Sequence, residues 1–299
     1  MKNHKLRPIA TYVSLAYATS WIIWLIGILG IHDLTSISDD RFFWFLFAGS
    51  FAPTASALIV TAFSGGWNDV MSLLRRLIVL KVDWKVYGIT FFLLPVIGVT
   101  TYLGLGIDNR VSMSGIVITA IAMMPLNALL GGIIFGIGPL GEEMGWRGFL
   151  QDRLQGHYNS IIVAIMIGFI WAAWHFPLVI SFDDFRSGLS LWEFIVLYPV
   201  FTILLAFTMG HLWRWSKGSL FIAIFFHAVS NMTVDIYLLN ARWWDFGDLT
   251  QLQIYLIILL VFALMAGVTE LLSRKIFLCP KVHSDGPDHI DDKDLKGSP

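Results

Sequence analysis

The sequence predicts an all-α, polytopic membrane protein of about eight transmembrane helices with an amphipathic helix at the membrane interface. Of its 299 residues, 57% are hydrophobic and only 14% are charged, and the mean hydropathy is +0.72. An ordinary soluble domain has about 25% charged residues, so this much apolar surface cannot be hidden in a water-soluble core. The composition therefore excludes a soluble enzyme, a disordered protein and a nucleic-acid binder.

Eight apolar stretches reach the length of about 20 residues that a helix needs to cross the hydrocarbon core of a bilayer. The predicted spans are residues 10–31, 43–64, 86–106, 115–141, 159–180, 191–212, 219–238 and 251–272. The first follows three basic residues, as a signal peptide would, but its apolar run is too long for one and no small-residue cleavage site stands out. We therefore predict that it is the first transmembrane helix.

Two segments differ from these spans in composition. Residues 67–80 are too short to cross a bilayer, and Arg75 and Arg76 can face the headgroups, which predicts an interfacial helix. From residue 273 onward the chain is polar, and we predict a disordered cytoplasmic tail over residues 273–299. Residues 1–272 are predicted to form a single transmembrane domain. The one cysteine, Cys279, lies in the tail, so no internal disulfide is expected.

The distribution of basic residues predicts the orientation in the membrane. Sixteen of the 20 Lys and Arg residues lie in the N-terminal leader, in the three loops 65–85, 142–158 and 213–218, and in the C-terminal tail. The loops between them on the other side contribute only four. Because basic loops stay on the cytoplasmic side, we predict a multi-pass protein with both termini in the cytoplasm.

Three polar motifs interrupt the apolar segments: EEMGWR at 142–147, WAAWH at 171–175 and HAVSN at 227–231. Ionisable side chains inside a bilayer are costly and by default mark a functional site. On a helix, Glu143 and Arg147 are four residues apart and share a face, a separation suited to an ion pair. Glu142 points about 100° away. The geometry predicts that Arg147 holds Glu143 and that Glu142 is available for chemistry.

The second and third motifs supply candidate partners for Glu142. His227 and Asn231 share a helix face, with Asp235 one turn further. The helical rise places these residues and His175 at depths that can converge with Glu142. Pro139 either kinks the fourth span or starts a new helix. The alternative interpretation of the Glu143–Arg147 pair is structural: it would only stabilise the fold. His211, Trp171 and Trp174 are predicted to be packing residues.

The three motifs, in this order on separate apolar segments, resemble those of the CPBP intramembrane proteases. This family includes the type II CAAX prenyl endopeptidases and bacterial bacteriocin-processing and immunity proteins. Its pattern is Glu-Glu-x-x-x-Arg, then an aromatic residue four positions before a His, then His-x-x-x-Asn/Asp. The residues flanking the motifs match too: Gly148 follows the Arg, and Phe176-Pro177 follows the His. The likeness covers about residues 120–240, and its one departure is Trp171, where Phe is commoner.

The resemblance implies a transmembrane protease domain that hydrolyses peptide bonds of membrane-associated, for instance prenylated, peptides. It implies a water nucleophile with Glu142 as general base and His175 positioning the water or protonating the leaving amine. His227 and Asn231 would bind the oxyanion or orient the water. Glu143 and Arg147 would brace the first motif. The implied partners are the lipid bilayer and a peptide or protein substrate, with no nucleic acid.

Two questions stay open at this level. Either the protein uses no cofactor, or it binds Zn²⁺ through Glu142, His175 and His227, with a water molecule in the remaining coordination position. The function is either catalytic or that of a non-catalytic membrane scaffold or regulator with the same fold. A transporter is a third reading, but the hydropathy shows no inverted repeat. The sequence does not identify the substrate.

Overall fold

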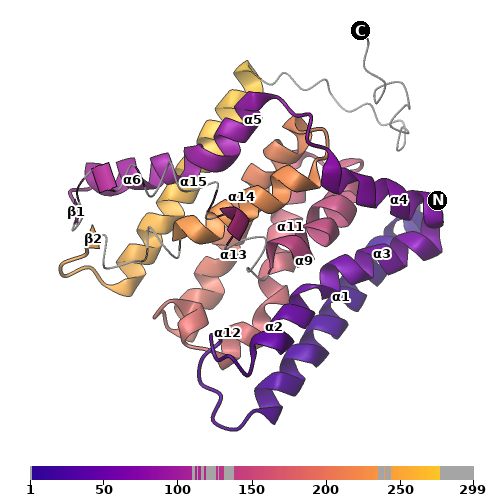
Figure 1. The fold of residues 1–299 in the computed structure, drawn as a ribbon, viewed down its shortest axis with the longest axis horizontal. Helices are drawn as coiled ribbons and strands as arrows, with labels where there is room; N and C mark the ends of the chain where they lie inside the picture. Colours follow the sequence, from indigo (N-terminus) through magenta and orange to yellow (C-terminus); the bar gives the residue numbers. More distant parts are fainter. Residues whose placement is uncertain are drawn as a thin grey trace.

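The computed structural model describes residues 2–109, 138–234 and 244–276, together with residues 112, 114, 115, 118, 126, 128–130 and 239. This part of the chain is mainly helical, as predicted (Figure 1). Its α-helices are α1 (Lys2–Gly30), α2 (Phe43–Ser50), α3 (Ala52–Gly65), α4 (Trp67–Arg75), α5 (Trp84–Gly88), α6 (Leu94–Gly104), α9 (Pro139–Glu143), α10 (Asp152–Gln155), α11 (Ser160–Trp174), α12 (Phe176–Ser181), α13 (Leu191–Trp215), α14 (Leu220–Met232) and α15 (Gln251–Lys275). Two π-helices, η2 (Ile89–Leu93) and η5 (Met144–Gln151), and two 3₁₀ turns, η1 (Arg76–Ile78) and η6 (Asp184–Arg186), complete the helical part. The strands β1 (Asp108–Asn109) and β2 (Trp244–Asp245) pair antiparallel.

Within the described ranges, five segments are long and apolar enough to cross a membrane. They are Arg7–Gly30, Phe43–Gly65, Trp84–Gly104, Leu191–Trp215 and Gln251–Lys275. Two shorter apolar helices, α11 and α14, lie where two more spans were predicted. The predicted span 115–141 falls mostly outside the described residues, as do the end of the span 219–238 and the tail from residue 277 onward.

Two of the predicted spans are interrupted, where the sequence analysis expected one continuous helix. His175 separates α11 from α12, and Phe51 separates α2 from α3. In each case a proline lies just after the break, Pro177 in the first turn of α12 and Pro53 in the first turn of α3. A proline has no N–H to donate to the preceding turn, so the carbonyls before it lose their helical partners.

The segment predicted to be interfacial forms the amphipathic helix α4, followed by η1. Val70 and Leu73 are buried, whereas the Trp67 side chain is 70% exposed. Its basic residues Arg75 and Arg76 lie at the C-terminal end, where they complement the helix dipole. The helix is thus one-sided, as an interfacial helix requires, while its place at the membrane surface stays a prediction.

The core is built from helices that pack lengthwise. The most extensive contact joins α11 to α13, and α1 packs along α3 and α2 (Figure 1). Between α11 and α13 the Thr202 hydroxyl donates a 2.9 Å hydrogen bond to the Gly168 carbonyl. A Cβ on Gly168 would lie 2.5 Å from Cγ1 of Ile203. A small residue and a polar side chain thus allow close approach of the two helices, as is usual within membranes.

The three loops predicted to lie on the cytoplasmic side meet at one end of the described part of the molecule. Arg76 on η1 donates to the Asp152 carboxylate on α10 at 2.9 Å, and the Ser219 hydroxyl donates to the Val79 carbonyl at 2.7 Å. The small β1–β2 sheet lies on the opposite side of the molecule from α4 (Figure 1). This clustering agrees with the basic-loop count, but which end faces the cytoplasm is not tested and stays a prediction.

Candidate active site

The first polar motif lies where a new helix begins. Gly138 is the N-cap residue with φ of +104°, and Pro139 follows it in the first turn of α9. Pro139 therefore starts a helix, and does not kink a continuous one. After Glu143 the backbone continues as the π-helix η5, all of whose residues are buried. Such helices are rare and occur frequently at functional sites. The sequence pattern gave no sign of this wider turn.

Glu143 and Arg147 form the ion pair that their spacing predicts. Arg147 Nη1 lies 3.2 Å from Glu143 Oε2, and neither side chain is exposed. Arg147 also donates from Nη2 to Met209 Sδ at 2.9 Å, and its guanidinium lies 4.5 Å from the centroid of the Trp171 ring. A buried charge is tolerated only when it is paired, and here each ion is the other's main partner.

Glu142 takes no part in this ion pair. Its Oε2 atom accepts hydrogen bonds from two indole N–H groups, that of Trp171 at 2.7 Å and that of Trp146 at 3.2 Å. The Glu142 side chain is buried, with 4% of the residue exposed. Its carboxylate is therefore held by neutral donors, which leaves it available for chemistry.

His175 lies in the break between α11 and α12, half-buried. Its backbone N–H bonds to the Ala172 carbonyl at 3.2 Å. It therefore does not bond to the Trp171 carbonyl, as it would in a continuous α-helix. That carbonyl lies 2.9 Å from His175 Nδ1. Because a carbonyl can only accept, Nδ1 carries the proton, and Nε2 is left to accept a proton or a hydrogen bond. The Tyr198 hydroxyl lies 3.3 Å from the same Nδ1 atom.

His227 on α14 bonds to the second carboxylate of the first motif. Its Nδ1 atom lies 2.8 Å from Glu143 Oε1, and the residue is 4% exposed. The imidazole packs edge-on against the Trp171 ring, with the centroids 5.0 Å apart. Asn231 lies one turn further along α14 with its side chain exposed. Asp235, predicted on the same stripe, lies outside the described residues.

Trp171 connects these groups, a role that the sequence analysis missed when it took Trp171 for a packing residue. The indole is buried, with 2% exposed, as a packing residue would be. Its N–H bonds to Glu142, its carbonyl holds His175, and its ring contacts His227 and Arg147. A chemical signal was present in the sequence. The indole N–H of a buried tryptophan needs a hydrogen-bond acceptor, whereas a phenylalanine ring has no N–H group.

The structure thus gathers Glu142, His175 and His227 around one tryptophan, with Glu143 and Arg147 directly behind them. The three residues considered as zinc ligands do not form a metal site, however. In the parts of the chain that the structure describes, no group of three or more His, Cys, Asp or Glu side chains could hold a metal ion. Among the described residues, hydrogen bonds occupy Oε2 of Glu142 and Nδ1 of His227 but leave Oε1 and the Nε2 atom of His227 free, so the obstacle is the arrangement of the three side chains. These side chains, as placed, do not fit Zn²⁺.

The fold and the site together define a polytopic helical membrane protein with a buried carboxylate–imidazole cluster. Residues 111–233, which include all three motifs, match the family model described as type II CAAX prenyl endopeptidase Rce1-like. The chain is also 25% identical over 248 residues to a protein of Methanococcus maripaludis named CAAX prenyl protease 2. That match covers 79% of this chain and 87% of the archaeal protein. The chain is thus similar to Rce1-like type II CAAX prenyl endopeptidases over the residues that carry the three motifs, and to the archaeal protein over most of its length.

Proposed function

We propose that this protein is an intramembrane endopeptidase that cleaves membrane-associated peptides with a water molecule activated by Glu142 and His175. The observation that carries the proposal is the separation of the two adjacent carboxylates. Glu143 is neutralised by Arg147 and bonded to His227, whereas Glu142 is bonded only by two indole N–H groups in the described part of the chain. A carboxylate without a cationic partner, beside an imidazole, is what a general base requires.

In the proposed reaction, water lies between Glu142 and Nε2 of His175. Glu142 takes one proton as the water oxygen adds to the carbonyl carbon of the scissile peptide bond. The proton then passes to the amide nitrogen, directly or through His175, and the C–N bond breaks to give a carboxylic acid and an amine, between which the second water proton is exchanged. No metal takes part in any of these steps.

The oxyanion of the tetrahedral intermediate needs donors that are already in place. We assign this role to Nε2 of His227 and the side-chain amide of Asn231. The bond from Nδ1 to Glu143 fixes the orientation of the His227 ring, and the donor role requires a proton on Nε2 as well. Asn231 is exposed on the same face of α14, and we place it beside the substrate.

The membrane location and the likeness to the archaeal protein support a proposed substrate class. The helices that can cross a bilayer place the protein in the membrane, where a substrate has to be tethered to the membrane or close to it. The archaeal relative is named for CAAX prenyl proteins, so a peptide that ends in a prenylated CAAX sequence is the first substrate to test. We place both termini, and the opening of the site, on the cytoplasmic side, because the basic loops gather at one end.

The test is cleavage of a farnesylated CAAX peptide by purified protein in lipid vesicles. Glu142→Gln, which keeps the size of the side chain, is expected to lower kcat by a factor of about 100 or more. Glu270→Gln is the matched control, because Glu270 also lies in an apolar helix but pairs with Arg274 at 2.7 Å, on α15. Full activity of Glu142→Gln would refute the assignment. Wild-type protein that cleaves neither prenylated nor unprenylated peptides would favour the scaffold function.

A further inference from the structure

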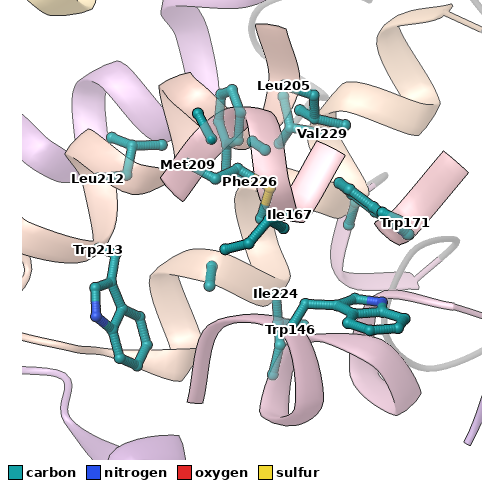
Figure 2. Packing of buried hydrophobic residues seen from close by; sticks show 14 of the residues in the cluster. Trp146, Ile167, Trp171, Leu205, Met209, Leu212, Trp213, Ile224, Phe226 and Val229 are labelled. Atoms are coloured by element: carbon teal, nitrogen blue, oxygen red, sulfur yellow. The ribbon is translucent and has the colours of Figure 1, made fainter. Parts of the chain in front are cut away.

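Two tryptophans from different helices bond to the same oxygen atom of Glu142. Trp146 lies on η5 and Trp171 on α11, 25 positions apart in the sequence, and both indole N–H groups donate to Oε2. Figure 2 shows the two indoles on the same side of the buried cluster. In the described part of the chain, no hydrogen bond reaches Oε1 of Glu142. The two oxygens of this carboxylate therefore have different environments.

The other carboxylate oxygen of Glu142, Oε1, lies beside the start of α9. A Cβ on Gly138 would approach Oε1 to 2.8 Å, so the glycine leaves open the space beside that atom. The Glu142 N–H donates to the Gly138 carbonyl at 2.8 Å, which holds the backbone at this point. Among the described residues, Oε1 is thus the oxygen of Glu142 without a hydrogen bond, and residue 138 has no side chain to cover it.

Both donors are themselves held in place. The Trp146 ring packs edge-on against Tyr12 and against Trp174, with centroids 5.8 and 5.6 Å away. The Trp171 ring lies between the Arg147 guanidinium at 4.5 Å and the His227 ring at 5.0 Å. Neither indole can rotate away without breaking such a contact. Hydrogen bonds to a charged oxygen are about twice as strong as those between neutral groups, so this pair of donors stabilises an anionic carboxylate in one orientation.

We infer that Trp146 and Trp171 are positioning residues that hold Glu142 by Oε2 and so leave Oε1 as the atom that takes the proton of the attacking water. This inference rests on the proposed function for the identity of the base. It adds two residues that touch neither water nor substrate and act through Glu142. Phenylalanine at position 171 would keep an aromatic ring and remove this indole donor.

The kinetic test compares three tryptophan-to-phenylalanine variants in vesicles. Trp171→Phe and Trp146→Phe each keep an aromatic ring and lose one donor. Each is expected to lower kcat about tenfold with KM within twofold of wild type. The double variant is expected to approach the activity of Glu142→Gln. Trp174→Phe is the matched control, because its buried indole lies one turn from Trp171 but donates to the Ser20 hydroxyl at 2.7 Å. It is expected to keep kcat within twofold.

A second measurement does not depend on activity. In protein labelled with ¹⁵N at the indoles, the resonance that disappears in Trp171→Phe identifies the Trp171 N–H, and Trp174→Phe identifies the control. In Glu142→Ala the first resonance is expected to shift and the second to stay unchanged. An unshifted Trp171 resonance would overturn the inference, whatever the activity of the variants.

The two hypotheses fail differently. If Glu142→Gln keeps full activity, the proposed base is wrong, and the indole resonances alone decide whether the two tryptophans hold the carboxylate. If Glu142→Gln is inactive while Trp146→Phe and Trp171→Phe match Trp174→Phe in kcat, the positioning role is wrong and the endopeptidase proposal stands.

Discussion

Glu142 and Glu143 are adjacent in the chain, yet hydrogen bonds connect them to different helices. Oε2 of Glu142 accepts from Trp171 on α11 at 2.7 Å, whereas Oε1 of Glu143 lies 2.8 Å from Nδ1 of His227 on α14. Only Glu143 is paired with Arg147. Two chemically identical side chains thus have different surroundings: Glu143 has a charged partner, whereas Glu142 has neutral donors. This difference underlies the predictions below.

We expect Arg147→Met to destabilise the protein strongly, because it leaves the fully buried Glu143 carboxylate without its ion-pair partner. Removing one member of a buried pair costs about 3–5 kcal/mol, which thermal unfolding in detergent would show as a lower Tm. The matched control is Arg274→Met, which breaks the exposed Glu270–Arg274 pair of the same spacing, for which the expected cost is at most about 1 kcal/mol. Equal Tm shifts for both variants would contradict the prediction. Adding Glu143→Gln to Arg147→Met is expected to recover part of the loss.

We expect Gly138→Ala to lower kcat, because its Cβ would lie 2.8 Å from Oε1 of Glu142 and would displace the carboxylate. The φ of +104° adds backbone strain of about 1–3 kcal/mol for any residue with a side chain. Gly66→Ala separates the two effects, since Gly66 has φ of +81° and no atom within 4 Å of the added Cβ. Both variants should lose stability, and only Gly138→Ala should lose activity beyond the loss of folded protein. Equal specific activity of the two folded variants would contradict this.

We expect His175→Ala to lower kcat by about 100- to 10,000-fold, the usual contribution of an acid–base group. Tyr198→Phe removes the hydroxyl that lies 3.3 Å from His175 Nδ1. That variant should lose less than about tenfold, because the Trp171 carbonyl still holds the same nitrogen at 2.9 Å. Measuring kcat for both variants with one peptide substrate tests the order. A larger loss in Tyr198→Phe than in His175→Ala would show that the tyrosine acts on the substrate itself.

We expect peptidase activity to survive dialysis against a chelator. In the described ranges no cluster of acidic, histidine or cysteine side chains could hold a metal ion. The measurement is the rate of peptide cleavage before and after dialysis, with the zinc content of the same samples. Loss of activity that returns on addition of zinc, but not of magnesium, would contradict the prediction and require these side chains to rearrange around the ion.

The membrane class and most of the helix positions could be read from local sequence. Of the eight predicted spans, the seven that lie mainly within the described residues each contain an apolar helix. A segment that crosses a bilayer needs about 20 apolar residues, and the mean hydropathy over that length detects such segments. The breaks at Phe51 and His175 were not predicted, although Pro53 and Pro177 follow them closely. Hydropathy does not register a proline that interrupts an apolar run, so each span was expected to be continuous.

The candidate site could be predicted only in part. The spacing of Glu143 and Arg147 predicted their ion pair, which the structure confirms at 3.2 Å. The spacing also grouped His227 with Asn231, but could not show that His227 bonds to Glu143 across 84 positions of the chain. It could not show that the helix end at Trp174 frees the Trp171 carbonyl for His175 either. The catalytic roles of these residues stay predictions.

The sequence by itself determined that the chain is a helical membrane protein and which three segments carry polar groups into it. These properties depend on composition and spacing within one segment, where the cost of exposing polar groups to lipid applies residue by residue. Only the tertiary structure decided which helix each carboxylate faces, and that the two indoles meet on one oxygen of Glu142. Such contacts join side chains from distant segments, and they depend on how whole helices pack, which no local pattern contains.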